Sequence, residues 1–401
     1  MVGAGRSQAP AIRRVLELGC RVVAVDGDRA APGLALASHA EVQDFSDADA
    51  VIEIGRRWAV DGVLSVASDR AVPIVATVAE RLALPGIGPQ VAERMTNKLL
   101  MREHLARGGV PQPSFAGVRT CGQARAALAQ VGLPAVIKPA DSGGQRGLSL
   151  VRTDDQLNEA FDAAVSFSQK GEVIVEQFCD GRELNAIVVV RSGVPTLVTL
   201  SDRRRPTGRG FGVGWLHVYP ADISQALARK VTNVIAHAIR ALGLREGIAF
   251  PQLIVSKDSG VQLIEIAARV AAGQMSDLVR VATGIDLVQI ALHQCTGQPV
   301  PSELVTPARS QPLAIRFFTA SPGVLPVGRV RLIEGLDDVR AAPGVLQAEL
   351  YFGEGDLIRP LQVDDDRRGY VLAIGKNRKE ALAHSKVAAE RLRVSVDPSQ
   401  P

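Results

Sequence analysis

Aromatic residues, cysteine clusters, long apolar runs and charge blocks are all scarce in this chain of 401 residues. Aromatic side chains make up 4% of it, so alanine, valine and leucine must fill the core. The four cysteines stand singly, at Cys20, Cys121, Cys179 and Cys295, and their spacing fits neither a zinc site nor a disulfide framework. This pattern favours a reducing compartment, and we expect a cytoplasmic protein.

Membrane segments and basic blocks are missing as well. We find no unbroken apolar stretch long enough to cross a bilayer and no signal peptide, so we expect no membrane association. The net charge is +4 and the longest basic block is Arg203–Arg205, which does not favour nucleic acid binding. With 46% hydrophobic and 22% charged residues, the composition is that of a globular protein, and the length predicts more than one domain.

Residues 1–95 alternate short β-rich runs with helical stretches, a pattern typical of a parallel sheet with helices on both faces. We expect strands at Val22–Val25 and Gly62–Val66, and helices at Ala9–Gly19 and Ala71–Leu82. The predicted fold of this segment is therefore a Rossmann-like α/β domain.

The chain opens on a glycine turn, Val2–Gly5, that leads into the first of these helices. The turn suggests a dinucleotide fingerprint, but Gln8 stands where that fingerprint needs its third glycine. It can still offer backbone N–H groups to a small anion. Because almost no residues precede Gly3, we expect the first strand to be truncated or to begin upstream.

Two neighbouring apolar runs each carry one polar residue. Glu265 lies inside Leu263–Ile266, and Gln252 lies inside Gly247–Val255. A short turn joins the two runs, so they should pair as a hairpin with both polar side chains on one face. Two oxygen ligands there suit a hard cation such as Mg2+. A salt-bridged structural glutamate beside a hydrogen-bonded glutamine is the alternative.

Two lysines stand where a phosphate site is expected. Lys98 begins a helix, where free N–H groups and a positive charge together favour an anion, although a solvated lysine is the alternative. Lys138 ends a β-rich run and precedes the loop Asp141–Gly147, whose N–H groups can fold over phosphates. The loop contains Gly143, Gly144 and Gly147. It is not a Walker loop, because its lysine comes before the glycines.

One further strand ends at Glu176–Phe178, and the next begins at Glu183 after a turn. Backbone groups at such a strand end can bind an adenine edge, and a carboxylate after the turn can bind ribose hydroxyls.

The order of these residues along the chain resembles the signature of the ATP-grasp superfamily of carboxylate–amine ligases. Those that carry the resemblance are Lys98, Lys138, the Asp141–Gly147 loop, Glu176–Phe178, Glu183, Gln252, Glu265 and Arg269.

The resemblance implies three domains. Residues 1–95 would be the α/β domain that precedes the grasp, and residues 96–305 the ATP-grasp domain of two α+β lobes, with a small lid lobe at about 115–178. Residues 306–401 look like the C-terminal α+β cap of the L-amino-acid ligase branch. The family also suggests a homodimer.

The resemblance further implies a role for each signature residue, with ATP and Mg2+ or Mn2+ as cofactors. The expected phosphate-binding residues are Lys98, Lys138, Ser142, Gly143, Gly144 and Gly147. Glu176, Gln177 and Phe178 would line the adenine pocket, and Glu183 would meet the ribose. Gln252 and Glu265 would hold the metal. Arg269, with Lys138, would serve the catalytic transfer of the phosphoryl group.

Ala267 departs from the family pattern, which has an asparagine at that position. Alanine cannot supply the amide oxygen that the asparagine offers to a second metal. The first metal position is Gln252 rather than an acid, so the site carries less negative charge than usual and we expect weaker Mg2+ binding. The charged positions are all retained, which favours an active enzyme.

Further residues are expected at the substrate. The segment Gly273–Gln274 enters a helix whose N–H groups suit a substrate carboxylate. His217 follows a glycine- and arginine-rich loop and is expected as a pocket wall rather than a catalytic base. Asp364–Arg368 is expected to be a solvated turn and not a metal site.

The resulting hypothesis is an ATP-dependent ligase that activates a carboxylate as an acyl phosphate and joins it to an amine, with two small-molecule substrates. One alternative is a ligase of nucleotide precursors or a biotin-carboxylase-like carboxylase. The other, motivated by Ala267, is a catalytically silent nucleotide-binding protein. The sequence does not identify the carboxylate or the amine.

Overall fold

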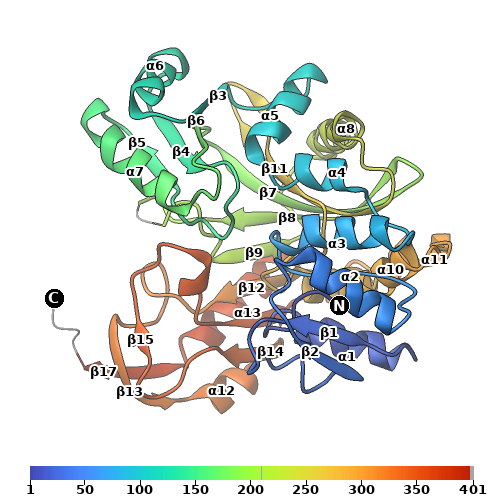
Figure 1. The fold of residues 1–401 in the computed structure, drawn as a ribbon. Coiled ribbons are helices and arrows are strands. Elements are labelled where there is room, and N and C mark those ends of the chain that lie inside the picture. The colour runs from blue at the N-terminus through green and yellow to red at the C-terminus, as the bar shows by residue number, and fades with distance from the viewer. Residues whose placement is uncertain (209, 398–401) are drawn as a thin grey trace.

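The computed structural model describes residues 1–208 and 210–397, and Figure 1 shows its ribbon. The described residues form four sheets, of two, three, four and eight strands. Within these ranges no helix is long and apolar enough to span a membrane. The eight-stranded sheet runs through the middle of the molecule, and the other three surround it (Figure 1).

The N-terminal segment packs helices around a small parallel sheet. Its elements are α1 (Ala9–Glu17), β1 (Val23–Asp26), β2 (His39–Val42), α2 (Ala48–Arg57), α3 (Ala71–Arg81) and α4 (Pro89–Arg94). The prediction of a strand at Gly62–Val66 is wrong, because this run does not form a regular strand. Val2 N donates to Leu64 O at 3.0 Å, but the chain then enters the glycine turn, so no ladder continues along this run.

The glycine turn itself already contacts a carboxylate. Ala4 N donates to Asp26 Oδ2 at 2.7 Å, and Gly3 N donates to Val25 O at 2.8 Å. These two N–H groups are therefore not available to an external anion, which corrects the expectation for this part of the turn. Gln8, in place of the third glycine, donates through Nε2 to Val66 O at 2.8 Å and ties the turn to the neighbouring segment.

A lid lobe follows, at the upper left of Figure 1. The helix α5 (Lys98–Arg107) leads into this lobe and packs its Met101 and Leu105 in the core of the large sheet. The elements of the lobe itself are β3 (Phe115–Val118), α6 (Cys121–Val131), β4 (Ala135–Pro139), β5 (Ser149–Val151), η1 (Asp154–Gln156), α7 (Leu157–Phe167) and β6 (Val173–Gln177). The strand order is β3-β6-β4-β5, and every pair is antiparallel. Leu128 from α6 and Phe161 from α7 pack on Ile137 and Val175 of the sheet, so the lobe has its own apolar core.

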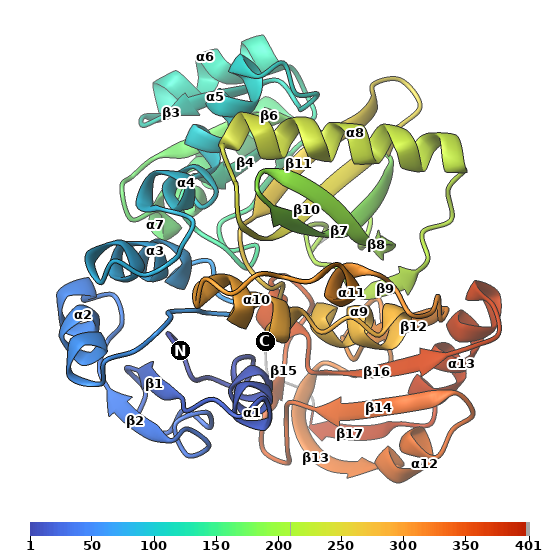
Figure 2. The same ribbon diagram turned by 90° about the vertical axis from the view of Figure 1, so that its right-hand side faces the viewer.

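The large sheet has the order β11-β10-β7-β8-β9-β12-β16-β14. Its strands are β7 (Arg182–Arg191), β8 (Val194–Arg204), β9 (Leu216–Tyr219), β10 (Gly247–Ser256), β11 (Gly260–Ala267), β12 (Leu313–Phe317), β14 (Val345–Leu350) and β16 (Gly369–Ile374). The associated helices are α8 (Gln225–Leu242), α9 (Met275–Thr283), α10 (Leu287–Cys295) and α11 (Ser302–Val305). The helix α8 lies across β7, β10 and β11 in Figure 2, while α9 and α10 cover the opposite face with α1.

Residue alternation along β7 explains where polar groups collect. Ile187 and Val189 enter the core shared with α9, and Leu184 and Val188 enter the core under α8. Residues two apart share a face of a strand, so Glu183 and Asn185 lie on the α9 side, toward the start of the strand. The start of β7 is thus polar on the face where its remainder is apolar.

The C-terminal segment adds a second layer and also completes the large sheet. Its elements outside that sheet are β13 (Gly328–Glu334), α12 (Leu336–Arg340), β15 (Leu357–Ile358), η2 (Asp364–Asp366), α13 (Arg378–Ala389) and β17 (Arg393–Asp397). The strands β15, β13 and β17 form the three-stranded sheet. Because β12, β16 and β14 pair onto β9, the predicted boundary at residue 305 falls between strands of one sheet, and the division into three domains stays a prediction.

Candidate active site

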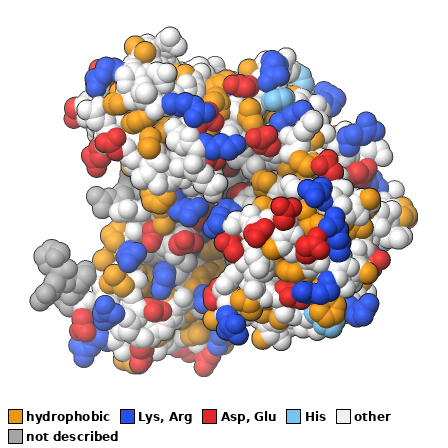
Figure 3. All heavy atoms as spheres, viewed as in Figure 1, with side chains coloured by type: hydrophobic (Ala, Val, Ile, Leu, Met, Phe, Trp, Pro, Cys, Tyr) orange, Lys and Arg blue, Asp and Glu red, His pale blue; other side chains and the backbone are white. Residues whose placement is uncertain are grey.

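A cleft lies between the lid lobe and the large sheet, and most of the predicted site residues line it. Figure 3 shows basic and acidic side chains together at the junction of the two parts. The predicted residues that line the cleft are Lys98, Lys138, Ser142, Gly143, Gly144, Glu176, Gln177, Phe178, Glu183, Gln252, Glu265 and Arg269. They come from the N-terminus of α5, the lid strands β4 and β6 with the loops that follow them, the start of β7, and the hairpin β10–β11 with the segment after it.

Glu176 is the centre of a buried ion cluster. Its Oε2 lies 2.7 Å from Lys138 Nζ and its Oε1 lies 2.7 Å from Arg102 Nε. Burial alone would raise the pKa of Glu176, but the two cations outweigh it and lower the pKa to about 2. The carboxylate therefore stays charged and holds the Lys138 ammonium at the wall of the cleft. Burial lowers the pKa of Lys138 despite this partner.

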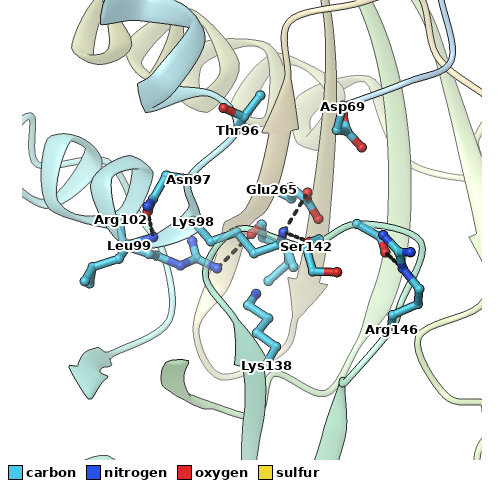
Figure 4. Close-up of polar contacts among 12 residues, drawn as sticks. Asp69, Thr96, Asn97, Lys98, Leu99, Arg102, Lys138, Ser142, Arg146 and Glu265 are labelled. Atoms are coloured by element: carbon cyan, nitrogen blue, oxygen red, sulfur yellow. Dashed lines mark hydrogen bonds and ion pairs between the residues drawn. The ribbon is translucent and has the colours of Figure 1, made fainter. Parts of the chain in front are cut away.

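Lys98 reaches from the helix start to both walls. Its Nζ donates to Ser142 O at 2.5 Å and lies 3.8 Å from Glu265 Oε1, as Figure 4 shows. Asn97 caps α5 by accepting from Leu99 N and Leu100 N, which explains why the helix begins at Lys98. The ammonium thus lies between the glycine loop and the hairpin carboxylate.

The hairpin pairs as predicted. Gln252 and Glu265 are direct partners across β10 and β11, so their side chains share one face. Both line the cleft. Ala267 lies two residues further along β11, opposite Phe250, and is buried in the apolar core. Within residues 1–208 and 210–397, no three histidine, cysteine or acidic residues gather as a metal-binding group.

Glu183 is held by two arginines from β8 and the loop after it. Its Oε1 accepts from Arg203 Nη1 at 2.7 Å, and Arg205 Nε lies 3.5 Å from Oε2. Oε2 is buried and has no hydrogen-bond partner among the described residues. Arg205 also lies over the Phe178 ring, at 5.4 Å from its centroid. Arg205 therefore stands at the predicted adenine and ribose end of the cleft.

Arg269 follows β11 and meets a carboxylate from the N-terminal segment. Its Nε and Nη2 donate to Asp69 Oδ1 and Oδ2 at 2.6 and 2.8 Å. Although burial opposes the charged form, the Asp69 carboxylate outweighs it and raises the pKa of Arg269. Nη1 is buried without a hydrogen-bond partner in the described part of the chain.

Four predicted residues lie outside the cleft lining. Gly147 packs at the base of the loop, where a Cβ would lie 3.1 Å from Ala163 O of α7. His217 is buried on β9 beside Asn185 Nδ2, at 3.2 Å from its Nδ1. Burial, with Arg203 and Arg367 nearby, lowers the pKa of His217 well below its ordinary value, so the ring is neutral at neutral pH.

Gly273 and Gln274 lie where β11 leads into α9. A Cβ on Gly273 would lie 3.3 Å from Arg367 Nη1 and 3.7 Å from the Phe317 ring. Gln274 Nε2 donates to Tyr351 Oη at 2.6 Å. Arg367 stacks on Phe317 at 4.6 Å, and Phe317 packs edge-on against His217 at 5.7 Å. We call His217, Gly273, Phe317 and Arg367 the substrate-side cluster.

The expectation of a solvated turn at Asp364–Arg368 is wrong for two of its residues. Asp364 lines the cleft, and its N–H donates to Gly144 O of the glycine loop at 3.2 Å. Arg367 lies 3.3 Å from the Asp364 carboxylate and belongs to the substrate-side cluster. The turn therefore contacts the glycine loop instead of lying wholly in solvent.

Sequence reasoning missed Arg102 and Asp69. Arg102 stands four residues after Lys98 on one helix, and this spacing places both side chains on the same face. Asp69 follows the Gly62–Val66 run, at the kind of strand end where α/β proteins bind ligands. Both signals were present in the sequence, but neither showed which distant residue would be the partner.

The cleft fits a nucleoside triphosphate. Two lysine ammonium groups and a glycine loop suit phosphates, and the buried Glu183 Oε2 and Arg269 Nη1 have capacity for further hydrogen bonds. Gln252 and Glu265 offer two oxygens to a hard cation, and the phosphates of a nucleotide can supply more. These residues therefore fit ATP with a divalent cation.

Comparison with known proteins agrees with this geometry. Residues 97–303 match the family model of the carbamoyl-phosphate synthase L chain ATP-binding domain, and residues 316–397 match that of the L-amino acid ligase C-terminal domain 2. A formate-dependent phosphoribosylglycinamide formyltransferase from Burkholderia thailandensis is 30% identical, over 98% of this chain and 94% of that protein.

Two solved structures share the fold. The L-amino acid ligase from Bacillus licheniformis has a TM-score of 0.84 at 21% identity, covering 99% of this chain and 98% of that one. The phosphoribosylglycinamide synthetase from Anaerococcus prevotii has a TM-score of 0.76 at 21% identity, with the same coverage. The first family match spans more than half of the chain, from residue 97 to residue 303 of 401. The chain therefore belongs to the ATP-grasp superfamily of ATP-dependent carbon–nitrogen ligases.

Proposed function

We propose that this ligase activates an amino-acid-like carboxylate and joins it to the amine of a second small molecule. The observation that carries the proposal is the position of Arg269, which lines the same cleft as Lys98, Lys138 and Glu265 and whose buried Nη1 has no hydrogen-bond partner among the described residues. The match of residues 316–397 to an L-amino acid ligase domain supports the choice of an amino acid.

The proposed reaction has two steps. A carboxylate oxygen of the first substrate attacks the γ-phosphorus of ATP, the bond to ADP breaks, and an acyl phosphate forms. The amine nitrogen of the second substrate then attacks the acyl carbon, phosphate leaves, and the amine loses a proton to solvent. Phosphoryl transfer depends on positioning and charge neutralisation, and Lys98, Lys138 and Arg269 supply the positive charge.

The remaining residues take the roles that their positions support. Glu176, Gln177 and Phe178 line the adenine end, Glu183 meets the ribose, and Ser142, Gly143, Gly144 and Gly147 belong to a loop that closes over the phosphates. Gln252 and Glu265 hold Mg2+ or Mn2+, which when bound neutralises phosphate charge. The substrate-side cluster, with Gln274, recognises the carboxylate. Because His217 is neutral, it serves as a wall of this pocket.

A second candidate is ligation of a nucleotide precursor. The 30% identity to a phosphoribosylglycinamide formyltransferase favours it, and Arg367 beside Gly273 would suit a substrate phosphate as well as a carboxylate. A third candidate is a protein that binds nucleotide without catalysis, because Ala267 places an apolar side chain where a metal ligand is expected. We further propose a cytoplasmic location and a homodimer, and gel filtration of the purified protein tests the dimer.

The test is phosphate release from ATP and Mg2+ with amino acids supplied singly and in pairs. We expect release with one or more pairs, together with a product whose mass equals the two acids minus water. The matched arm supplies formate with phosphoribosylglycinamide. Release in that arm alone would establish the second candidate, and nucleotide binding without release in any arm would favour the silent protein.

Changing Gln252 to glutamate is expected to tighten cation binding. The substitution adds a carboxylate beside Glu265 on the same face of the hairpin, and oxygen sites gain affinity with ligand charge. We expect the Kd for Mn2+ in the presence of ADP to fall by about tenfold, measured by electron paramagnetic resonance. Lys257→Gln lowers the net charge by the same one unit at the exposed end of the hairpin and should not change the Kd. Equal effects of both variants would show that the site lies elsewhere.

A further inference from the structure

Asp69 and Arg269 form a two-point ion pair across the cleft wall. The residues are 200 positions apart, and two parallel hydrogen bonds of 2.6 and 2.8 Å join the carboxylate to Nε and Nη2. The Arg269 side chain is 11% exposed. Because the guanidinium is planar, this arrangement fixes its orientation as well as its position.

The pair leaves one edge of the guanidinium unused. Nη1 is buried, and among residues 1–208 and 210–397 it has no hydrogen-bond partner. Both Asp69 and Arg269 line the cleft, with Lys98 and Glu265. The residue that carries the unused donor thus lies within the group of charges that surrounds the predicted phosphates. A carboxylate that bound the other edge would turn Nη1 out of this position.

Docking of the N-terminal segment does not require this carboxylate. Val66 and Val270 form a parallel bridge, and Ala67 N donates to Val270 O at 3.0 Å, directly beside the ion pair. The backbone therefore already joins the two segments. What Asp69 adds is the orientation of a charged group, a contribution that backbone contacts cannot make.

Asp69 also touches the lid. A Cβ built on Gly143 would lie 3.2 Å from Asp69 Oδ2, so the glycine loop approaches the carboxylate closely. Figure 4 shows Asp69 on the far side of Glu265 from Lys98, above the loop that carries Ser142. The carboxylate thus lies between Arg269 and the loop that is proposed to cover the phosphates.

We propose that Asp69 is a positioning residue, which holds Arg269 so that Nη1 binds the phosphoryl group in transfer. The proposal rests on the proposed function of the cleft, because it takes the γ-phosphate of ATP as the group that Arg269 meets. It assigns a role in phosphoryl transfer to the N-terminal segment, which the sequence pattern of the grasp domain does not include.

The test compares two nucleotides that differ in the γ-phosphate. The Kd values of ADP and of the non-hydrolysable analogue AMPPNP are measured with Mg2+ by titration calorimetry on the full chain. We expect the wild type to prefer AMPPNP, and Asp69→Asn to reduce that preference roughly tenfold while the Kd of ADP is unchanged. Arg269→Gln should reduce it as well, and the double variant should lose no more than Arg269→Gln alone.

Arg14→Gln is the matched control. It breaks a different ion pair between the N-terminal segment and the rest of the chain, Arg14 Nε to Asp286 Oδ2 at 2.6 Å, outside the cleft lining. We expect it to leave both Kd values unchanged. Thermal melting of each variant shows whether it is folded. If Asp69→Asn does not fold, the same two Kd values are measured for Asp69→Glu.

Three outcomes would overturn the proposal: no preference of the wild type for AMPPNP, an equal loss for both nucleotides in Asp69→Asn, or a full Asp69→Asn effect in the Arg269→Gln background. The measurement needs neither a carboxylate nor an amine. Failure to find turnover with any substrate pair would count against the proposed function but would leave this readout intact. The two failures are therefore distinguishable.

Discussion

Glu265→Gln is expected to lower the rate of phosphate release by at least about 100-fold. Glu265 is the one carboxylate of the hairpin pair, because its cross-strand partner Gln252 is neutral. The substitution keeps the size of the side chain and removes all negative charge from the pair. A hard cation would then meet two amide oxygens, which hold it weakly. The measurement is kcat for ATP hydrolysis or ligation with the substrate pair that the activity screen identifies.

Moving the carboxylate to the partner strand provides the control. In the double variant Gln252→Glu with Glu265→Gln, the charge lies directly across the hairpin on the same face. We expect partial recovery of kcat, because the charge of the pair is restored near its original position. Lys257→Ala, at the exposed turn of the hairpin, should leave kcat at the wild-type value. Activity of Glu265→Gln within a factor of about two of wild type would show that this carboxylate does not hold the metal.

Arg102→Met is expected to lower the free energy of unfolding by roughly 3–5 kcal/mol. Arg102 is 1% exposed and donates to Glu176 Oε1 at 2.7 Å. It also donates to Leu263 O at 2.9 Å and to Ile264 O at 2.7 Å. Methionine fills a similar volume but leaves these acceptors without a donor, and Glu176 retains Lys138 alone as a cation. The measurement is urea unfolding followed by circular dichroism.

Adding Glu176→Gln to Arg102→Met shows whether the loss of stability comes from the unpaired buried charge or from the change in side-chain packing. The buried carboxylate is the costly group once Arg102 is gone, so Arg102→Met with Glu176→Gln should be more stable than Arg102→Met alone. Arg107→Met removes an arginine from the same helix, at a side chain that is 65% exposed, and should shift the unfolding midpoint little. If Arg102→Met unfolds at the wild-type urea concentration, the cluster does not stabilise the fold.

The hairpin shows how far sequence reasoning reached into this site. Its two strands were apolar apart from Gln252 and Glu265, and a short turn joined them. We predicted that both polar side chains would share a face of the hairpin, and the structure confirms that they are direct partners. The register set by the turn, which pairs Leu253 with Leu263, would place Gln252 opposite Ile264. A β-bulge between Gln252 and Leu253 shifts the pairing by one residue and makes Glu265 the partner, which the sequence pattern did not predict.

Lys98, Lys138 and Glu176 were found by their order along the chain, but their contacts were not. Lys98 was expected at phosphates, and it also joins the glycine loop to Glu265. Glu176 was expected to line the adenine pocket, which stays a prediction, and its side chain also holds Lys138 of β4 and Arg102 of α5. Sequence order identifies which residues approach a ligand, whereas the side-chain partners depend on how the lid packs on the hairpin.

The sequence by itself determined the superfamily, the hairpin and the α/β character of the first segment, because these depend on periodicity, turns and residue order. Only the tertiary structure decided that Asp69 holds Arg269, that Asp364 reaches the glycine loop, and that C-terminal strands complete the large sheet. These contacts join residues far apart in the chain, and no local propensity specifies such a partner. Their geometry follows from the packing of the sheet against its neighbours.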